Sequence, residues 1–167
     1  SNKIKAVIRE LSTNAVDSLV DAGTTDFGFE VHLPTSLSPE FYIRDFGTGL
    51  SHEDVVGLYT TYFSSNKTDS NDFTGQLGLG SKSPFAYTDS FTVTSFFNGM
   101  KRIYNAHISE SGYPAISLLS EGVCSDKNGI EIRFPVKGED VYNFESEAVE
   151  VYSHFNILPS FIDKTIE

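Results

Sequence analysis

Residues 75–84 read Gly75-Gln76-Leu77-Gly78-Leu79-Gly80-Ser81-Lys82-Ser83-Pro84. Three glycines within six residues let the backbone take positive φ angles and let a ligand approach its amide groups closely. Ser83-Pro84 predicts the start of a short helix, because proline is tolerated at the first helical position. A glycine-rich turn that runs into a helix N-terminus presents N–H groups to an anion such as phosphate. The stretch is not a Walker A loop, because no Gly-Lys-Ser/Thr closes it, and alone it is compatible with an ordinary turn.

The composition indicates one acidic domain. A chain of 167 residues is long enough for one domain with a real core. The net charge of -11 makes a nucleic-acid backbone a poor direct partner, whereas a surplus of acid suits a site that recruits Mg²⁺. The single cysteine, Cys124, excludes an internal disulfide and a cysteine-based zinc site. We expect no membrane span and no signal peptide, because no apolar run is long enough.

The first strong periodic pattern predicts a helix over 3–21. Its apolar positions recur at helical spacing and are Ile4, Val7, Ile8, Leu11, Ala15 and Leu19. Beside them runs a second stripe, Glu10, Asn14, Asp17 and Asp21. Acids repeated on one face without lysines repel one another. The stripe is either a solvated face or the edge of a site that holds a cation or performs catalysis, and the spacing leaves both interpretations open.

A second motif follows the next two predicted elements, strands over 27–33 and 41–45 joined by a polar loop. The second strand ends in Arg44-Asp45-Phe46-Gly47-Thr48-Gly49. An aspartate at a strand end, followed by two glycines, is well placed to accept a hydrogen bond from a ligand amine. The alternative is a tight turn with aspartate as turn former. Ser51 is expected to cap a helix that continues through Tyr62.

The remaining pattern predicts an α+β domain. Residues 64–72 are polar and are expected to form a mobile lid before the glycine-rich turn. Strands are predicted over 91–97, 101–108, 114–119 and 130–135, with a hairpin turn at Asn98-Gly99. The order of elements indicates a sandwich with helices on one sheet face. We expect residues 1–138 to form the main domain and the helical segment 139–167 to begin a truncated following domain.

Three stretches together resemble the three sequence boxes of the GHKL ATPases, namely 10–18, 45–49 and 75–80. That superfamily includes Hsp90 chaperones, type II topoisomerase ATPase domains, mismatch-repair ATPases and sensor histidine kinases. The resemblance implies a Bergerat fold, a two-layer α/β sandwich of a mixed, mostly antiparallel sheet with helices on one face and a lid loop. Residues 44–54 and 77–85 are also similar to a phage rapid-lysis family that protects against prophage-induced early lysis.

The resemblance implies a role for each box. Asn14 would ligate Mg²⁺ that bridges the ATP phosphates, and Glu10 would deprotonate the attacking water. Asp45 would accept a hydrogen bond from the adenine amine, while Gly47 and Gly49 admit the base and ribose. The turn amides would hold the β- and γ-phosphates. The predicted ATP contacts are Asn14, Asp45, Gly47, Gly49, Lys67, Gly75, Gln76, Leu77, Gly78, Leu79, Gly80, Ser81 and Lys82. One departure is Ile130, which follows Asn128-Gly129 where many family members have threonine.

The resemblance implies Mg²⁺-dependent binding and slow hydrolysis of ATP as a conformational switch. A second hypothesis is a nucleotide-responsive interaction module with negligible hydrolysis that antagonises a host exclusion system. A DNA-handling ATPase is less favoured because of the net charge. Expected partners are ATP and ADP, a nucleotide-dependent second copy and a host protein, in the cytoplasm of an infected bacterium.

Overall fold

The N-terminal periodic pattern forms α1 (Asn2–Ala22) in the computed structural model, which describes residues 2–64 and 83–162. All six predicted apolar positions of the helix are buried, with exposed fractions of 3% or less. The helix ends at Ala22, and the next residue, Gly23, has a φ of 71° that is compatible with the hydrogen bond from Thr24 N–H to Leu19 C=O. The predicted helix and its inward face are confirmed.

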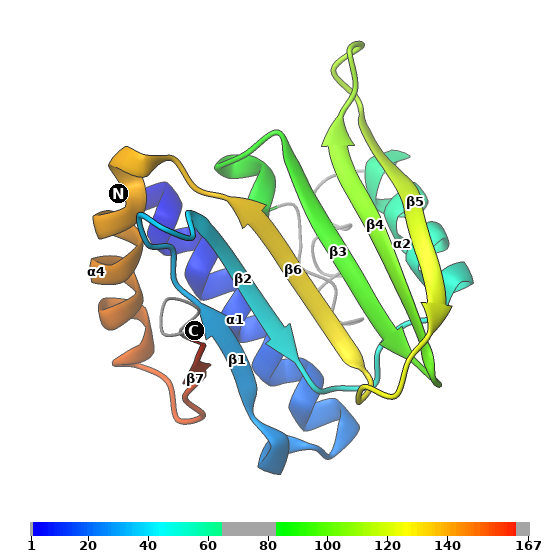
Figure 1. Ribbon diagram of the computed structural model, residues 1–167, viewed down its shortest axis with the longest axis horizontal. Helices are drawn as coiled ribbons and strands as arrows, with labels where there is room; N and C mark the ends of the chain where they lie inside the picture. The colour runs from blue at the N-terminus through cyan, green and yellow to red at the C-terminus, as the bar shows by residue number, and fades with distance from the viewer. Residues whose placement is uncertain (1, 65–82, 163–167) are drawn as a thin grey trace.

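The strands form one seven-stranded sheet in the order β5-β4-β3-β6-β2-β1-β7, and Figure 1 shows the long helices of the described residues behind it. The strands are β1 (Phe29–His32), β2 (Glu40–Asp45), β3 (Ser90–Phe97), β4 (Met100–Ile108), β5 (Pro114–Val123), β6 (Gly129–Pro135) and β7 (Ser160–Phe161). All neighbours pair antiparallel except β1 and β7, which are parallel. The predicted α+β class with a mixed, mostly antiparallel sheet is therefore correct.

The register of the central strands determines which side chains enter the core. Ile43 of β2 lies opposite Ile132 of β6, which also pairs with Val93 of β3, and all three are buried. Because side chains alternate across a sheet, Asp45 shares the helix-facing side with Ile43. The end of β2 therefore carries a carboxylate into the layer between α1 and the sheet.

The two other helices cover the same face. Helix α2 (His52–Ser64) begins after Ser51, whose hydroxyl accepts a hydrogen bond from Asp54 N–H at 3.1 Å, as predicted for the cap. Helix α4 (Val141–Tyr152) packs against α1, and its buried residues belong to the same core as the sheet. Residues on both sides of the expected boundary at 138/139 thus share one core. No described helix is both long enough and apolar enough to cross a bilayer.

Several predicted boundaries need correction. Residues Thr25–Phe27 form a 3-10 helix and β1 starts only at Phe29, because Gly28 between them has a φ of 66°. Strand β5 continues beyond the predicted end to Val123, and β7 was not predicted. The hairpin turn at Asn98-Gly99 is confirmed by φ angles of 51° and 81°. Ser64, the first residue of the predicted lid, is the last residue of a helix, and the rest of the lid and the glycine-rich turn over 75–80 lie outside the described residues.

Candidate functional site

The carboxylate of Asp45 is the most deeply buried charge of the candidate site. Its side chain is 4% exposed, and its Oδ1 accepts hydrogen bonds from Gly47 N–H at 2.9 Å and Ile130 N–H at 3.3 Å. The hydroxyl of Ser18 on α1 donates to the same carboxylate. Burial raises the pKa of the Asp45 carboxyl to about 6, although these donors and the nearby Arg44 act in the opposite direction. Asp45 is therefore a mostly ionised hydrogen-bond acceptor at neutral pH.

Asn14 faces the same region from α1. The residue is 9% exposed, and its Nδ2 has no hydrogen-bond acceptor within the described residues. A buried polar group without a partner costs about 1–3 kcal/mol. A ligand oxygen that accepted from this amide would offset that cost.

The side chains of Asn14 and Asp45 line one small cavity between α1 and the sheet. The remaining lining residues are apolar: Leu11, Ala15, Ile43, Ile130 and Ile132. Its volume of about 10 Å³ is the space of a single water molecule. A complete nucleotide needs a pocket of several hundred Å³. The cavity therefore has room only for the ligand atoms that touch the Asp45 carboxylate and the Asn14 amide. The rest of a nucleotide would need space outside the cavity.

Glycines bring the backbone segments around Asp45 unusually close together. A Cβ atom on Gly47 would overlap the Ser18 hydroxyl, and one on Gly49, whose φ is 75°, would overlap the Phe96 carbonyl oxygen. Gly129 has a φ of 147°, and a Cβ there would overlap the Asp45 carbonyl oxygen. Bare backbone at these positions lets α1, the end of β2 and the start of β6 converge on one carboxylate.

Arg44 fixes the loop that precedes β6. Its guanidinium lies between the rings of Phe46 and Phe96, 4.2 and 4.0 Å from their centroids. It donates to the carbonyl oxygens of Asp45, Lys127 and Asn128. Because Lys127 and Asn128 lie just before Ile130, these bonds hold in place the amide that reaches Asp45.

Glu10 lies one turn before Asn14 on α1 and is partly buried, yet it does not line the small cavity. Asp17 and Asp21, further along the same stripe, are exposed. Although the Asp17 side chain is exposed, it loses some of its hydration to neighbouring protein atoms. This desolvation, and next the negative charge of Asp21, raise the pKa of the Asp17 carboxyl. The acidic stripe therefore divides: its first half approaches the core edge and its second half is a solvated face.

The predicted phosphate contacts at Lys67 and Gly75–Lys82 lie outside the described residues. Ser83 and Pro84, which directly follow, are buried at the start of a 3-10 helix (Ser83–Ala86), as the proline predicted. In the described part of the chain, no three or more His, Cys, Asp or Glu side chains gather to hold a metal ion. A Mg²⁺ ion here would depend on the Asn14 amide oxygen together with ligand oxygens and water.

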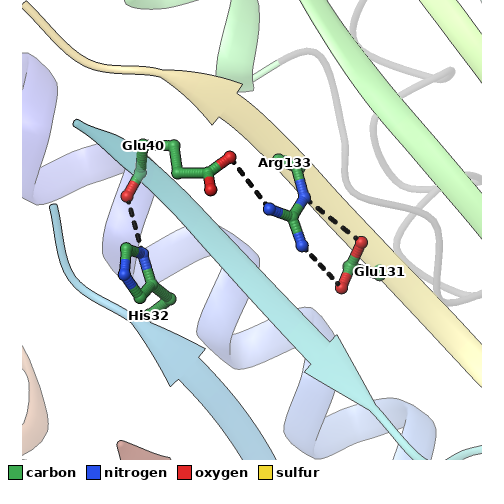
Figure 2. A network of polar contacts seen from close by, with 4 residues as sticks. All are labelled: His32, Glu40, Glu131 and Arg133. Atoms are coloured by element: carbon green, nitrogen blue, oxygen red, sulfur yellow. Dashed lines mark hydrogen bonds and ion pairs between the residues drawn. The ribbon is translucent and has the colours of Figure 1, made fainter. Parts of the chain in front are cut away.

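A larger cavity, of about 450 Å³, lies at the opposite end of β2, where Glu40 and Arg133 contribute to its wall. Figure 2 shows that Arg133 is already engaged, with Nη1 donating to Glu40 at 2.8 Å and Nη2 to Glu131 at 3.3 Å. The backbone carbonyl of Glu40 in turn contacts His32 Nδ1 at 2.9 Å. Two carboxylates surround the one guanidinium, so this wall does not favour a phosphate.

Sequence reasoning missed two contributors to the Asp45 site. Ser18 stands four residues after Asn14, so its place on the same helix face was visible, but its contact with Asp45 depends on how closely α1 approaches β2. The Ile130 amide was also missed, because a backbone donor leaves no residue-type signal. The glycine before it, Gly129, was the only local indication of a close approach.

Comparison of the chain with models of known protein families gives no match, and comparison with curated proteins finds no relative.

Proposed function

We propose that this domain binds ATP in a Mg²⁺-dependent manner and hydrolyses it slowly, in the way of a GHKL ATPase. The observation that supports this most directly is the meeting of two motifs. Asn14 and Asp45 belong to separate predicted boxes, and their side chains line the same buried cavity. In the proposed complex, Asp45 would accept a hydrogen bond from the adenine amine, and the Asn14 amide oxygen would serve as a ligand of Mg²⁺.

Calorimetric titration with ATP and ADP, with and without Mg²⁺, tests the proposal. We expect Asp45→Ala to weaken ATP binding roughly tenfold to a hundredfold, because a hydrogen bond to a charged group contributes about 1.5–3 kcal/mol. Asp126→Ala removes an exposed carboxylate from the loop before β6 and serves as the matched control. Absence of ATP binding by the wild type, or equal binding by the Asp45→Ala variant, would contradict the proposal.

The position of Glu10 favours a second candidate function, that of a nucleotide-responsive interaction module with negligible hydrolysis. Glu10 lies on the correct helix, but it is not among the residues that line the cavity with Asn14 and Asp45. If Glu10 is the general base, Glu10→Gln abolishes phosphate release under single-turnover conditions and leaves ATP affinity within about twofold. Equal, slow phosphate release by wild type and variant, with ATP still altering the affinity for a partner, would support the second candidate.

The proposed biological setting rests on the narrower sequence similarity. It supports a phage protector protein that acts on a host protein in the cytoplasm of the infected bacterium. Salt-dependent DNA binding would instead support the less favoured DNA-handling ATPase.

A further inference from the structure

The cavity at the start of β2 is separate from the Asp45 site. It measures about 450 Å³ and is formed by the loop before β2, the first residues of β3 and the last residues of β6. Glu40 and Asp45 stand at the two ends of β2, an odd number of positions apart, so their side chains point to opposite faces of the sheet. Asp45 faces α1, whereas Glu40 lies on the face on which, among the described residues, no long helix packs (Figure 1). A pocket of this size admits a side chain or a small molecule.

The charged groups at this cavity leave one carboxylate oxygen unused. Arg133 lies over the Tyr42 ring, with its guanidinium carbon 4.1 Å from the ring centroid. Figure 2 shows that the guanidinium donates to both oxygens of Glu131 and to Oε1 of Glu40. The other oxygen, Oε2 of Glu40, forms no hydrogen bond with a described residue, and the Glu40 side chain is 31% exposed. Because two carboxylates surround one guanidinium, a further cation would neutralise the group.

The unused oxygen favours an ammonium group over a second guanidinium. A guanidinium binds a carboxylate best through two parallel hydrogen bonds, and these need both oxygens. Arg133 already occupies Oε1 of Glu40, so a second guanidinium would find only Oε2. An ammonium is a compact charge with three rotatable donors, and it can bond to a single carboxylate oxygen while water takes its other protons. The wall therefore matches the end of a lysine side chain.

Exposed apolar side chains surround this charged wall. Leu37, Pro39 and Pro135 line the cavity and are exposed, Leu37 to 83%. Leu37 stands in a turn that is closed by backbone hydrogen bonds in both directions between Thr35 and Ser38, at 3.0 and 3.2 Å. A leucine on a turn that is already held in place offers apolar contact at a small cost in conformational entropy. The aliphatic stem of a lysine packs on such a rim while its charged end reaches the carboxylate.

The space available extends beyond a single side chain. A second cavity, of about 530 Å³, adjoins the first, because both have Ser90 and Pro135 in their walls. Its lining includes the aromatic residues Phe85 and Tyr87, and one aspartate and one lysine whose charges balance. The two cavities together are here called the Glu40 groove. A small amine would occupy only the charged part of this groove, whereas a peptide would also place residues that flank its lysine against the apolar parts.

We propose that the Glu40 groove binds a segment of a partner protein in which a lysine stands next to apolar residues. The lysine ammonium donates to Oε2 of Glu40, one apolar neighbour packs on Leu37, and the segment continues toward Tyr87. Charge also favours such a partner at longer range, since a chain with a net charge of -11 attracts a basic protein.

NMR titration of the isotope-labelled chain with the capped peptide Ala-Leu-Lys-Leu-Ala tests the proposal. We expect the amide signals of Glu40, Thr92 and Arg133 to shift, and those of α4 on the other side of the sheet to stay in place. The matched peptide with glutamine for lysine has the same length and apolar residues without the charge. It should bind at least roughly fivefold more weakly, the upper range for a partly exposed ion pair. Equal binding of the two peptides, or shifts confined to other faces, overturns the proposal.

Two variants separate the Glu40 contact from the net charge of the chain. Glu40→Gln keeps an oxygen that accepts from Arg133 and removes the unused carboxylate oxygen, so the lysine peptide should bind at least roughly fivefold more weakly. Glu145→Gln removes the same charge from an exposed position on α4 and should bind the peptide like the wild type. Equal binding by wild type and Glu40→Gln overturns the proposal. If spermidine binds the wild type more tightly than the peptide does, and Glu40→Gln loses that affinity, the occupant is a small polyamine and the assignment to a partner protein is overturned.

Discussion

Asp45 carries its charge into a layer whose buried residues are mostly apolar, and the hydrogen bonds around it offset the cost of burying that charge only in part. Three donors reach the carboxylate, two from the backbone and one from Ser18. The guanidinium of Arg44 makes its hydrogen bonds to backbone carbonyls and forms no direct ion pair with the Asp45 side chain. A carboxylate that is ionised without a direct counter-charge is suited to receive a donor from a ligand.

This burial predicts a pH dependence of stability. The pKa of Asp45 in the folded protein is about 6, above the value of about 3.9 for an unfolded aspartate. The folded protein therefore binds more protons between these two values, and the free energy of unfolding falls as pH rises through this window. Asp45→Asn lacks this titration. We expect the stability of wild type relative to Asp45→Asn to fall by up to roughly 3 kcal/mol from pH about 4 to about 7, measured by urea unfolding.

The comparison with Asp45→Asn cancels the titration of every other group. A stability difference that stays constant over this pH range would show that the carboxyl is not buried as described. An opposite slope, with wild type gaining stability on the alkaline side, would mean that its donors outweigh desolvation.

At the scale of elements, the junction of β2 and β6 depends on Gly129. A side chain there would meet the Asp45 carbonyl oxygen and the Arg44 guanidinium, and the φ of 147° is itself unfavourable for other residues. We expect Gly129→Ala to lower the free energy of unfolding by about 2–4 kcal/mol. Gly122→Ala in β5 is the control, because no atom lies within 4 Å of its added Cβ and its φ is unremarkable. Equal effects of the two substitutions on urea unfolding would refute this account of the junction.

Most elements could be predicted because their signals are local. The apolar spacing from Ile4 to Leu19 and the Asn98-Gly99 turn each specify an element within a short window. The end of β5 could not be predicted, because Ser120, Glu121 and Gly122 favour a strand only when they are paired with β4. Strand β7 depends on pairing with Glu30 and Val31, some 130 positions earlier in the chain, and has no local signature.

The candidate site likewise has residues that the sequence predicts and contacts that it does not. Asn14 and Asp45 each stand in a motif of nearby residues, so both could be predicted. The hydrogen bonds from Ser18 and Ile130 to Asp45 arise only when α1, β2 and β6 pack together, and no short window of sequence contains that information.

At the scale of the whole molecule, the described residues predict one cooperative unit that includes α4. Phe144 of α4 is fully buried, and its ring centroid lies 5.7 Å from that of Phe41, 6.1 Å from Phe134 and 5.3 Å from Tyr87. Phe144→Ala should therefore lower the free energy of unfolding by about 3–5 kcal/mol. Tyr142→Ala on the same helix, where the side chain is 74% exposed, should change it by less than about 0.5 kcal/mol.

Hydrogen exchange shows whether that loss is shared by the sheet. If α4 and the sheet unfold together, Phe144→Ala speeds the exchange of the most protected amides of β2 and β6 by the same factor as those of α4, because all exchange through global unfolding. If residues from 139 onward belong to a separate unit, only the α4 amides lose protection and those of β2 and β6 keep their rates. The shared ring cluster favours the first result, since removing Phe144 also removes packing from Phe41 on β2 and Phe134 on β6.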